Sequence, residues 1–187
     1  MLSKKILWIC PLLVLMTLIS GCQKMTQYSL SQQVINSALQ KQLSQYNQSI
    51  DASDLLKIDL AFNDMSVDIG QTEPNKIVAN GNAMASVQTP LGKQNVAIKL
   101  RLKALPELNK QQEAIYLKQV EIADYQINSA LGSLSSGTLL PYLNQALQLY
   151  FEHNPIYQLD KRNTMEYLIF SSASKVNIEQ GKLVFSW

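Results

Sequence analysis

The sequence predicts an α+β domain in which a long, highly curved antiparallel sheet wraps around a long amphipathic helix, with a further helix near each end of the chain. Three observations lead to this prediction. Between residues 55 and 127, apolar residues alternate with polar ones, and the phase of the alternation flips twice. One alternating stretch has an apolar face built mostly of small residues. Residues 138–153 have a helical apolar period with an unusually wide apolar arc.

Residues 1–21 have the pattern of a signal peptide. Lys4 and Lys5 precede an apolar run over residues 6–19, which is shorter than the roughly 20 residues that a membrane-spanning helix needs. The stretch Ile19-Ser20-Gly21-Cys22 resembles the lipobox of bacterial lipoproteins, in which the cysteine sulfur receives diacylglycerol and the signal is cut before it. The resemblance implies that Cys22 is the lipid attachment site and that the protein contacts the membrane through acyl chains.

Cys22 is the only cysteine left once the signal peptide is removed, because Cys10 lies inside that segment. It therefore has no partner for a disulfide within the chain, and lipidation accounts for it. In such lipoproteins an Asp after the cysteine retains the protein in the inner membrane. Here the residue is Gln23, which favours the periplasmic face of the outer membrane. Residues 22–28 are expected to form a lipidated tether and residues 29–187 a single domain.

Charge argues against a nucleic-acid partner. Loss of residues 1–21 removes Lys4 and Lys5 and leaves 14 basic and 14 acidic residues, with no basic run. Binding to a phosphate backbone depends on clustered Lys and Arg. The predicted domain is therefore expected to have other partners.

The first predicted elements are a helix and a bulged strand. Ser29 and Gln32 have capping-box spacing and are expected to open a helix with an apolar stripe from Val34 to Tyr46. In the next stretch, even positions up to Phe62 are apolar and odd positions from Met65 onward are apolar. Because side chains along a strand alternate with a period of two, this flip predicts a β-bulge at Asn63-Asp64.

Three further strands are expected. Residues 77–87 have an apolar face of mainly Ala and Gly, which predicts a close approach from another element. Residues 96–105 alternate clearly, and Pro106 is expected to end that strand. In the third, Ile115 and Leu117 give way to Val120 and Ile122, which predicts a second bulge near Lys118-Gln119.

The long helix is predicted from about Thr138 to His153, with Pro141 in its first turn and Asn154-Pro155 ending it. At about 100° per residue, its apolar side chains cover an arc of about 200°. Such a helix needs cover over most of its circumference, which a curved sheet can provide. The tail predicts a short helix over residues 164–173 and a hairpin in which Val176 and Ile178 face Leu183 and Phe185.

Several stretches carry a family resemblance. "EPNKI", "IKLRLKALP" and "TLLPYLNQALQLYFEHNPIY", together with the lipobox, resemble the enterobacterial YceB-like lipoproteins. That family in turn resembles the tubular lipid-binding (TULIP) superfamily, in which a highly curved sheet wraps a long helix and encloses an apolar groove. The resemblance implies the same fold here, and lipid binding by analogy.

No catalytic, metal or cofactor site is predicted. His153 lies at a helix end, where a cation complements the helix dipole, and no second histidine exists. The carboxylate pairs Asp64 with Asp68 and Glu121 with Asp124 are interpreted as solvated faces. The Gly- and Ser-rich stretch over residues 132–137 lacks the Lys of a phosphate-binding loop.

Two functions remain open, and both are non-enzymatic. In the first, a phospholipid, fatty acid or other apolar ligand binds between sheet and helix. The predicted groove is lined by Ala79, Ala83, Ala85, Leu143, Ala146, Leu147 and Tyr150. In the second, these side chains simply fill a core, and the protein acts by docking on an envelope protein. The two differ in whether ligand or side chains occupy the space.

Overall fold

The computed structural model describes residues 27–43, 47–53, 56–89, 92–128, 136–160 and 162–187. The predicted signal peptide, Cys22 and most of the predicted tether lie outside these residues. No helix within the described ranges is long and apolar enough to cross a membrane. The architecture is α+β with two antiparallel sheets.

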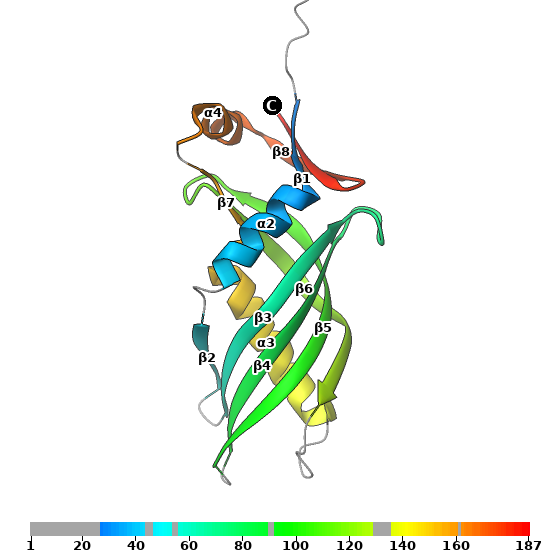
Figure 1. Ribbon diagram of the computed structural model, residues 1–187, viewed down its shortest axis with the longest axis vertical. Coiled ribbons are helices and arrows are strands. Elements are labelled where there is room, and N and C mark those ends of the chain that lie inside the picture. Colours follow the sequence, from blue (N-terminus) through cyan, green and yellow to red (C-terminus); the bar gives the residue numbers. More distant parts are fainter. Residues whose placement is uncertain (1–26, 44–46, 54–55, 90–91, 129–135, 161) are drawn as a thin grey trace, which may run out of the picture.

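The larger sheet has six strands in the order β2-β3-β4-β5-β6-β7, each antiparallel to its neighbours. Its strands are β2 (Asn47–Ser53), β3 (Leu56–Ile69), β4 (Ile77–Thr89), β5 (Gly92–Asn109), β6 (Ala114–Asn128) and β7 (Tyr157–Gln158). Helix α3 (Ser136–His153) contacts β2, β3 and β6. Because β2 and β6 lie on opposite sides of the sheet order, the sheet must bend around the helix to bring both against it (Figure 1).

The smaller sheet joins the two ends of the chain. Its order is β1-β9-β8, formed by β1 (Gln27–Ser31), β8 (Lys175–Glu179) and β9 (Lys182–Ser186). Helix α4 (Thr164–Ser172) precedes β8, and both lie at the same end of the molecule as β1 (Figure 1). The predicted hairpin is confirmed, since Val176 pairs with Phe185 and Ile178 with Leu183.

The first helix begins later than predicted. Ser29 lies in β1, opposite Val184, and α2 spans Gln32–Leu43. Because β1 starts at Gln27, the last two residues of the predicted tether are also part of the fold. The cap is supplied by Ser31, whose Oγ accepts a hydrogen bond from the Val34 N–H at 3.4 Å. Both serines pair within β1, and Ser31 is the one that directly precedes the helix.

Amide side chains of α2 complete the outer edge of β3. The Val67 N–H donates to Asn36 Oδ1 at 2.7 Å, and Asn36 Nδ2 donates back to the Val67 carbonyl at 3.0 Å. Gln40 Nε2 donates to the Met65 carbonyl at 2.7 Å. Strand β2 pairs with β3 only as far as Ala61, so α2 satisfies backbone groups that the sheet would leave open.

Both predicted bulges are confirmed. The β3–β4 register shifts between Phe62 and Asp64, and the β5–β6 register shifts between Lys103 and Leu105, opposite residues 118–121. Gln119 has a φ of 52°, a left-handed conformation that suits an inserted residue. A further shift lies between Arg101 and Leu102, where β6 carries one extra residue between Ile122 and Asp124.

The prediction that Pro106 ends its strand is wrong. Strand β5 continues to Asn109, and Pro106 pairs with Leu117 of β6. The pairing of β4 with β5 stops at Ala104. Pro106 therefore lies where β5 has a neighbour on one side only, and an edge tolerates a residue without an N–H.

The long helix differs from its prediction in two ways. It begins at Ser136, so Pro141 lies in its second turn and not its first. Among residues 140–153, whose exposure the structure describes, the buried side chains of this helix are Leu143, Ala146, Leu147, Tyr150 and Phe151. They span about 140° at 100° per residue, whereas Tyr142, Gln145 and Gln148 are exposed. The helix is thus covered on one face and open to solvent on the other.

Candidate functional site

The seven residues of the predicted groove come together in the interior. All belong to one hydrophobic cluster, and each side chain is at most 3% exposed. Ala79, Ala83 and Ala85 come from β4, and the other four come from α3. The structure therefore places helix and sheet residues around a common core, and solvent barely reaches this part of it.

An aromatic cluster explains the small-residue face of β4. The Phe62 ring lies 4.9 Å from the Tyr150 ring and 6.0 Å from the Phe151 ring, measured between centroids. A Cβ placed on Gly81 would lie 3.2 Å from Phe62 Cδ1 and 3.0 Å from the Asp64 carbonyl oxygen. The close approach predicted for this face is thus made by the Phe62 ring and by the bulged backbone beside it.

The line of contact between α3 and β6, called the seam below, carries two surface pockets. One has a volume of about 490 Å³ and is lined by Glu121, Ile122, Ala123, Asp124, Tyr125, Leu140, Pro141 and Asn144. The other has a volume of about 470 Å³ and is lined by Leu117, Lys118, Gln119, Val120, Gln145, Gln148, Leu149 and Glu152. Both volumes are in the range of small-molecule sites.

The two pockets coincide with the two bulges of β6. Ala123 is the extra residue of one bulge and lines the first pocket, which is called the Ala123 pocket below. Gln119 lines the second pocket. A bulge turns the strand and interrupts its regular packing against a neighbour. Ile122 and Tyr125 of the Ala123 pocket also pack against the hydrophobic cluster, so the apolar wall of this pocket is continuous with the core.

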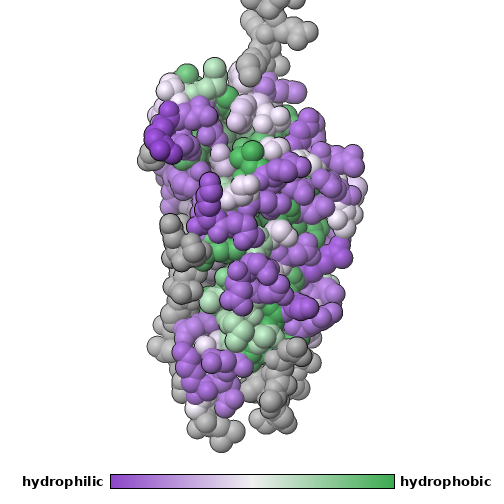
Figure 2. Space-filling model, in the orientation of Figure 1, coloured by the Kyte–Doolittle hydropathy of each residue, from purple (hydrophilic) through white to green (hydrophobic). Residues whose placement is uncertain are grey.

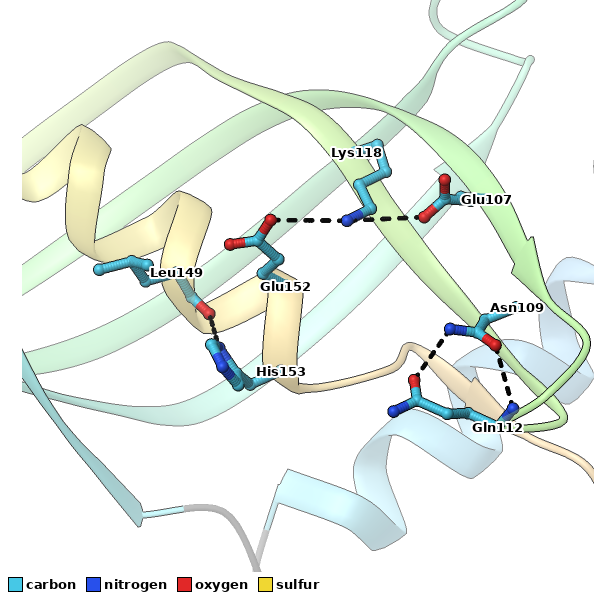
Figure 3. A network of polar contacts seen from close by, with 7 residues as sticks. All are labelled: Glu107, Asn109, Gln112, Lys118, Leu149, Glu152 and His153. Carbon is cyan, nitrogen blue, oxygen red and sulfur yellow. Dashed lines mark hydrogen bonds and ion pairs between the residues drawn. The ribbon is translucent and has the colours of Figure 1, made fainter.

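Polar contacts surround the Gln119 end of the seam (Figure 3). Lys118 Nζ lies 3.5 Å from Glu107 Oε2 and 3.7 Å from Glu152 Oε1, linking β5, β6 and α3. His153 Nδ1 donates to the Leu149 carbonyl at 2.8 Å, and the ring is exposed at the helix end. These side chains are solvent-accessible, so each ion pair contributes little stability.

The carboxylate pairs have local structural partners. Asp64 Oδ2 accepts from Asn82 Nδ2 at 2.7 Å, and Asp68 Oδ1 accepts from the Gln71 and Thr72 N–H groups. Asp124 Oδ1 accepts from its neighbouring Tyr125 N–H at 2.9 Å. Within the described residues, no group of three or more His, Cys, Asp or Glu is placed to hold a metal ion.

A buried polar pair escaped the sequence analysis. The Tyr157 hydroxyl donates to Glu166 Oε1 at 2.5 Å, and Glu166 is buried. Burial, followed by the hydrogen bond to Glu166, raises the pKa of Tyr157 well above its usual value. The Asn163 side chain caps α4 by accepting from the Glu166 N–H, and the Asn163-x-x-Glu166 spacing could have marked the start of that helix, although the inward-turned Glu166 side chain does not complete a capping box. No local signal shows that this Glu side chain turns inward.

Comparisons with known proteins bear on the family and the fold. A family model described as "Protein of unknown function (DUF1439)" matches residues 30–182. The "Uncharacterized lipoprotein YceB" of Salmonella typhimurium is 34% identical over 173 residues, and that of Escherichia coli is 32% identical, each over 92% of both chains. A crystal structure of lipopolysaccharide binding protein matches with a TM-score of 0.33 and 10% identity. It covers 86% of this chain, which spans about half (48%) of that protein.

Proposed function

The chain belongs to the DUF1439 family and is a YceB-like lipoprotein, and from that premise we propose that it binds a lipid or another apolar ligand at the seam between α3 and β6. It acts as a non-enzymatic binding protein. Its acyl chains, attached at Cys22, anchor it in the outer membrane with the domain on the periplasmic face. The ligand is a phospholipid or a fatty acid.

The observation that carries the proposal is the Ala123 pocket, which combines a volume of about 490 Å³ with an apolar wall of Ile122, Tyr125, Leu140 and Pro141. An acyl chain bound there would be removed from water and would contact side chains that also pack against the hydrophobic cluster. Apolar lining with a few polar groups at the rim is typical of ligand sites. Glu121, Asp124 and Asn144 supply such a rim, whose two carboxylates suit the ammonium group of a zwitterionic headgroup.

The proposal includes a TULIP-like arrangement of sheet and helix. Its support within this chain is that α3 contacts β2 and β6, two strands separated by three others in the same sheet. A ligand that entered at the seam would reach the predicted groove residues by parting α3 from β6. The exposed ion pairs of Lys118 oppose that movement only weakly.

Native mass spectrometry of residues 23–187, secreted without the lipidation signal, tests the proposal. We expect the domain to co-purify with phospholipid or fatty acid. Ala123→Trp should fill the Ala123 pocket and lower the fraction of the domain that carries bound lipid. Ala97→Trp is the matched control, because Ala97 is also an exposed strand alanine but lies outside that pocket. A wild-type domain free of bound lipid would contradict the proposal.

The second function, a filled core with docking on an envelope protein, is favoured by the burial of the seven predicted groove residues. Ala83→Trp and Ala146→Trp distinguish the two functions. In a packed core each replacement should lower the free energy of unfolding by ~1–3 kcal/mol or more. If a ligand normally occupies the space between these residues, each replacement should displace the bound lipid. It should then change the stability of the lipid-free domain little. Thermal melts paired with ligand analysis separate these outcomes.

A further inference from the structure

The exposed face of α4 is apolar and carries no charge. Met165 is 59% exposed and Leu168 is 56% exposed, and Tyr167 lies on the same side of the helix. The other exposed residues of α4 are Thr164, Ser171 and Ser172. A surface helix ordinarily shows charged residues to water, and exposed apolar patches mark interaction sites. The single acid of this helix, Glu166, instead points inward to Tyr157.

The C-terminal residue extends this apolar surface. Trp187 is 46% exposed and follows Ser186, the last residue of β9. The Ser174 N–H, just after α4, donates to the Ser186 carbonyl at 2.8 Å. The C-terminus therefore lies beside the end of α4, and green, hydrophobic residues are visible at this end of the molecule (Figure 2). Met165, Tyr167, Leu168 and Trp187 are called the α4 patch below.

The membrane anchor joins the fold at the same place. Gln27, the first residue of β1, pairs with Ser186, the residue before Trp187. Cys22 lies five residues before Gln27, so an extended chain between them reaches about 18 Å at most. Acyl chains on Cys22 would thus hold this end of the domain within a short distance of the bilayer. This step rests on the lipid anchoring in the proposed function.

We propose that the α4 patch lies on the lipid bilayer that holds Cys22 and fixes the orientation of the domain on the membrane. Tyr and Trp side chains favour the interface between headgroups and acyl chains, and Met165 and Leu168 supply the apolar contact. Lys110 and Lys175 lie beside the patch: Lys110 Nζ donates to the Ser171 carbonyl, and Lys175 pairs with Ser186. Both can contact anionic headgroups.

Trp187 is its own reporter, because removal of residues 1–21 takes away Trp8 and leaves a single tryptophan. The mature, acylated protein is reconstituted into phosphatidylethanolamine–phosphatidylglycerol vesicles, with or without bromine on the acyl chains. Flotation of the vesicles measures anchoring independently. We expect Trp187 emission to shift to the blue and to be strongly quenched by brominated lipid. The double variant Met165→Glu, Leu168→Glu should still float with the vesicles but lose most of the quenching.

Tyr142→Glu is the control for the added charge. Tyr142 is exposed on α3, whose first turns lie at the opposite end of the molecule from α4 (Figure 1), and its replacement should leave quenching unchanged. A wild-type protein that floats with unquenched Trp187 overturns the inference and assigns the patch to a protein partner. Quenching that survives the double substitution also overturns it. A wild type that fails to float contradicts the anchoring itself, and ligand occupancy is measured separately by mass spectrometry.

Discussion

At the scale of single residues, the pair Tyr157 and Glu166 ties α4 to β7. The carboxylate is buried at the first turn of the helix, and the phenol hydroxyl is its side-chain hydrogen-bond donor. A buried acceptor that loses its donor keeps its full desolvation penalty. Tyr157→Phe should therefore lower the free energy of unfolding by ~1–3 kcal/mol at neutral pH, as measured by urea denaturation. Tyr142→Phe, which removes an exposed hydroxyl, should change it by less than about 0.5 kcal/mol.

The same pair predicts alkaline destabilisation. The pKa of Tyr157 in the folded protein is raised above the ordinary value of 10.0, mainly by burial and then by Glu166. Above about pH 10 the unfolded chain releases this proton while the folded protein keeps it, so stability falls as pH rises through the folded-state pKa. Denaturation at pH 9 to 12 should show a steeper loss for the wild type than for Tyr157→Phe. Parallel curves would show that the phenol is not held neutral by folding.

The residue pattern predicted some side-chain environments and missed others. The Ala and Gly positions of β4 indicated a close approach, because a missing side chain leaves visible space. The identity of the approaching ring, Phe62, depends on how β3 bulges and could not be read from β4. The burial of Glu166 depends on Tyr157, which lies nine residues away on another element. Pairing of that kind leaves no local periodicity.

At the scale of elements, the two sheets meet where β3 ends. The Gly181 N–H, in the β8–β9 turn, donates to the Ile69 carbonyl at 2.7 Å, and the Gln32 N–H donates to the Gly181 carbonyl at 2.9 Å. Gly70 follows Ile69 with a φ of +64° and lies against this turn. A Cβ on Gly70 would lie 2.8 Å from Ile178 Cγ2 and 3.1 Å from the Glu179 carbonyl oxygen. The junction therefore requires glycine for both conformation and space.

Gly70→Ala should destabilise the protein more than Gly181→Ala. Both glycines are left-handed, with φ values of +64° and +75°, so alanine costs about 1–2 kcal/mol at either position. At Gly181 the nearest atom is Nε2 of the flexible Gln71 side chain, which can move away. At Gly70 the backbone of β8 is in the way, and the junction must open. Chemical denaturation of the two variants measures the difference in unfolding free energy. Equal losses of stability would show that the junction imposes no further constraint at Gly70.

The boundaries of helices and strands show which features the sequence alone could predict and which it could not. Alternation located both predicted bulges, since a phase flip is a direct record of strand geometry. The shift beside Ala123 was missed although the sequence carries the same signal, since two residues separate Ile122 from Tyr125, as two separate Phe62 from Met65. Pro106 and Ser29 were misinterpreted for one reason: whether proline ends a strand, or serine caps a helix, depends on which neighbours the sheet provides. The long helix was predicted as a helix, but its arc was overestimated because aromatic and leucine side chains such as Tyr142 are also tolerated in water.

At the scale of the whole molecule, the chain brings its two ends into one small sheet and places the seam on the larger one. Strand β1 adds to the edge of β9, so the N-terminal part of the domain cannot leave without exposing that edge. The larger sheet bends until β2 and β6 both contact α3, and the two bulges of β6 lie along the α3–β6 line. The proposed ligand site therefore lies on the larger sheet and the strand that follows the proposed anchor lies in the smaller one, so we expect that each can be altered without the other.

The last prediction concerns the anchor, and two adjacent residues test it. Labelled palmitate should be incorporated into the wild type and absent from Cys22→Ser, because the sulfur and the freed amine of that cysteine are the predicted attachment points of the acyl chains. Gln23→Asp should keep the label but shift the protein from the outer to the inner membrane fraction on a density gradient. The described residues begin at Gln27, so neither substitution alters a described contact, and we expect thermal melts of the domain to stay unchanged. A wild type that takes up no palmitate, or a Gln23→Asp variant that remains in the outer membrane, would contradict the anchoring or the sorting respectively.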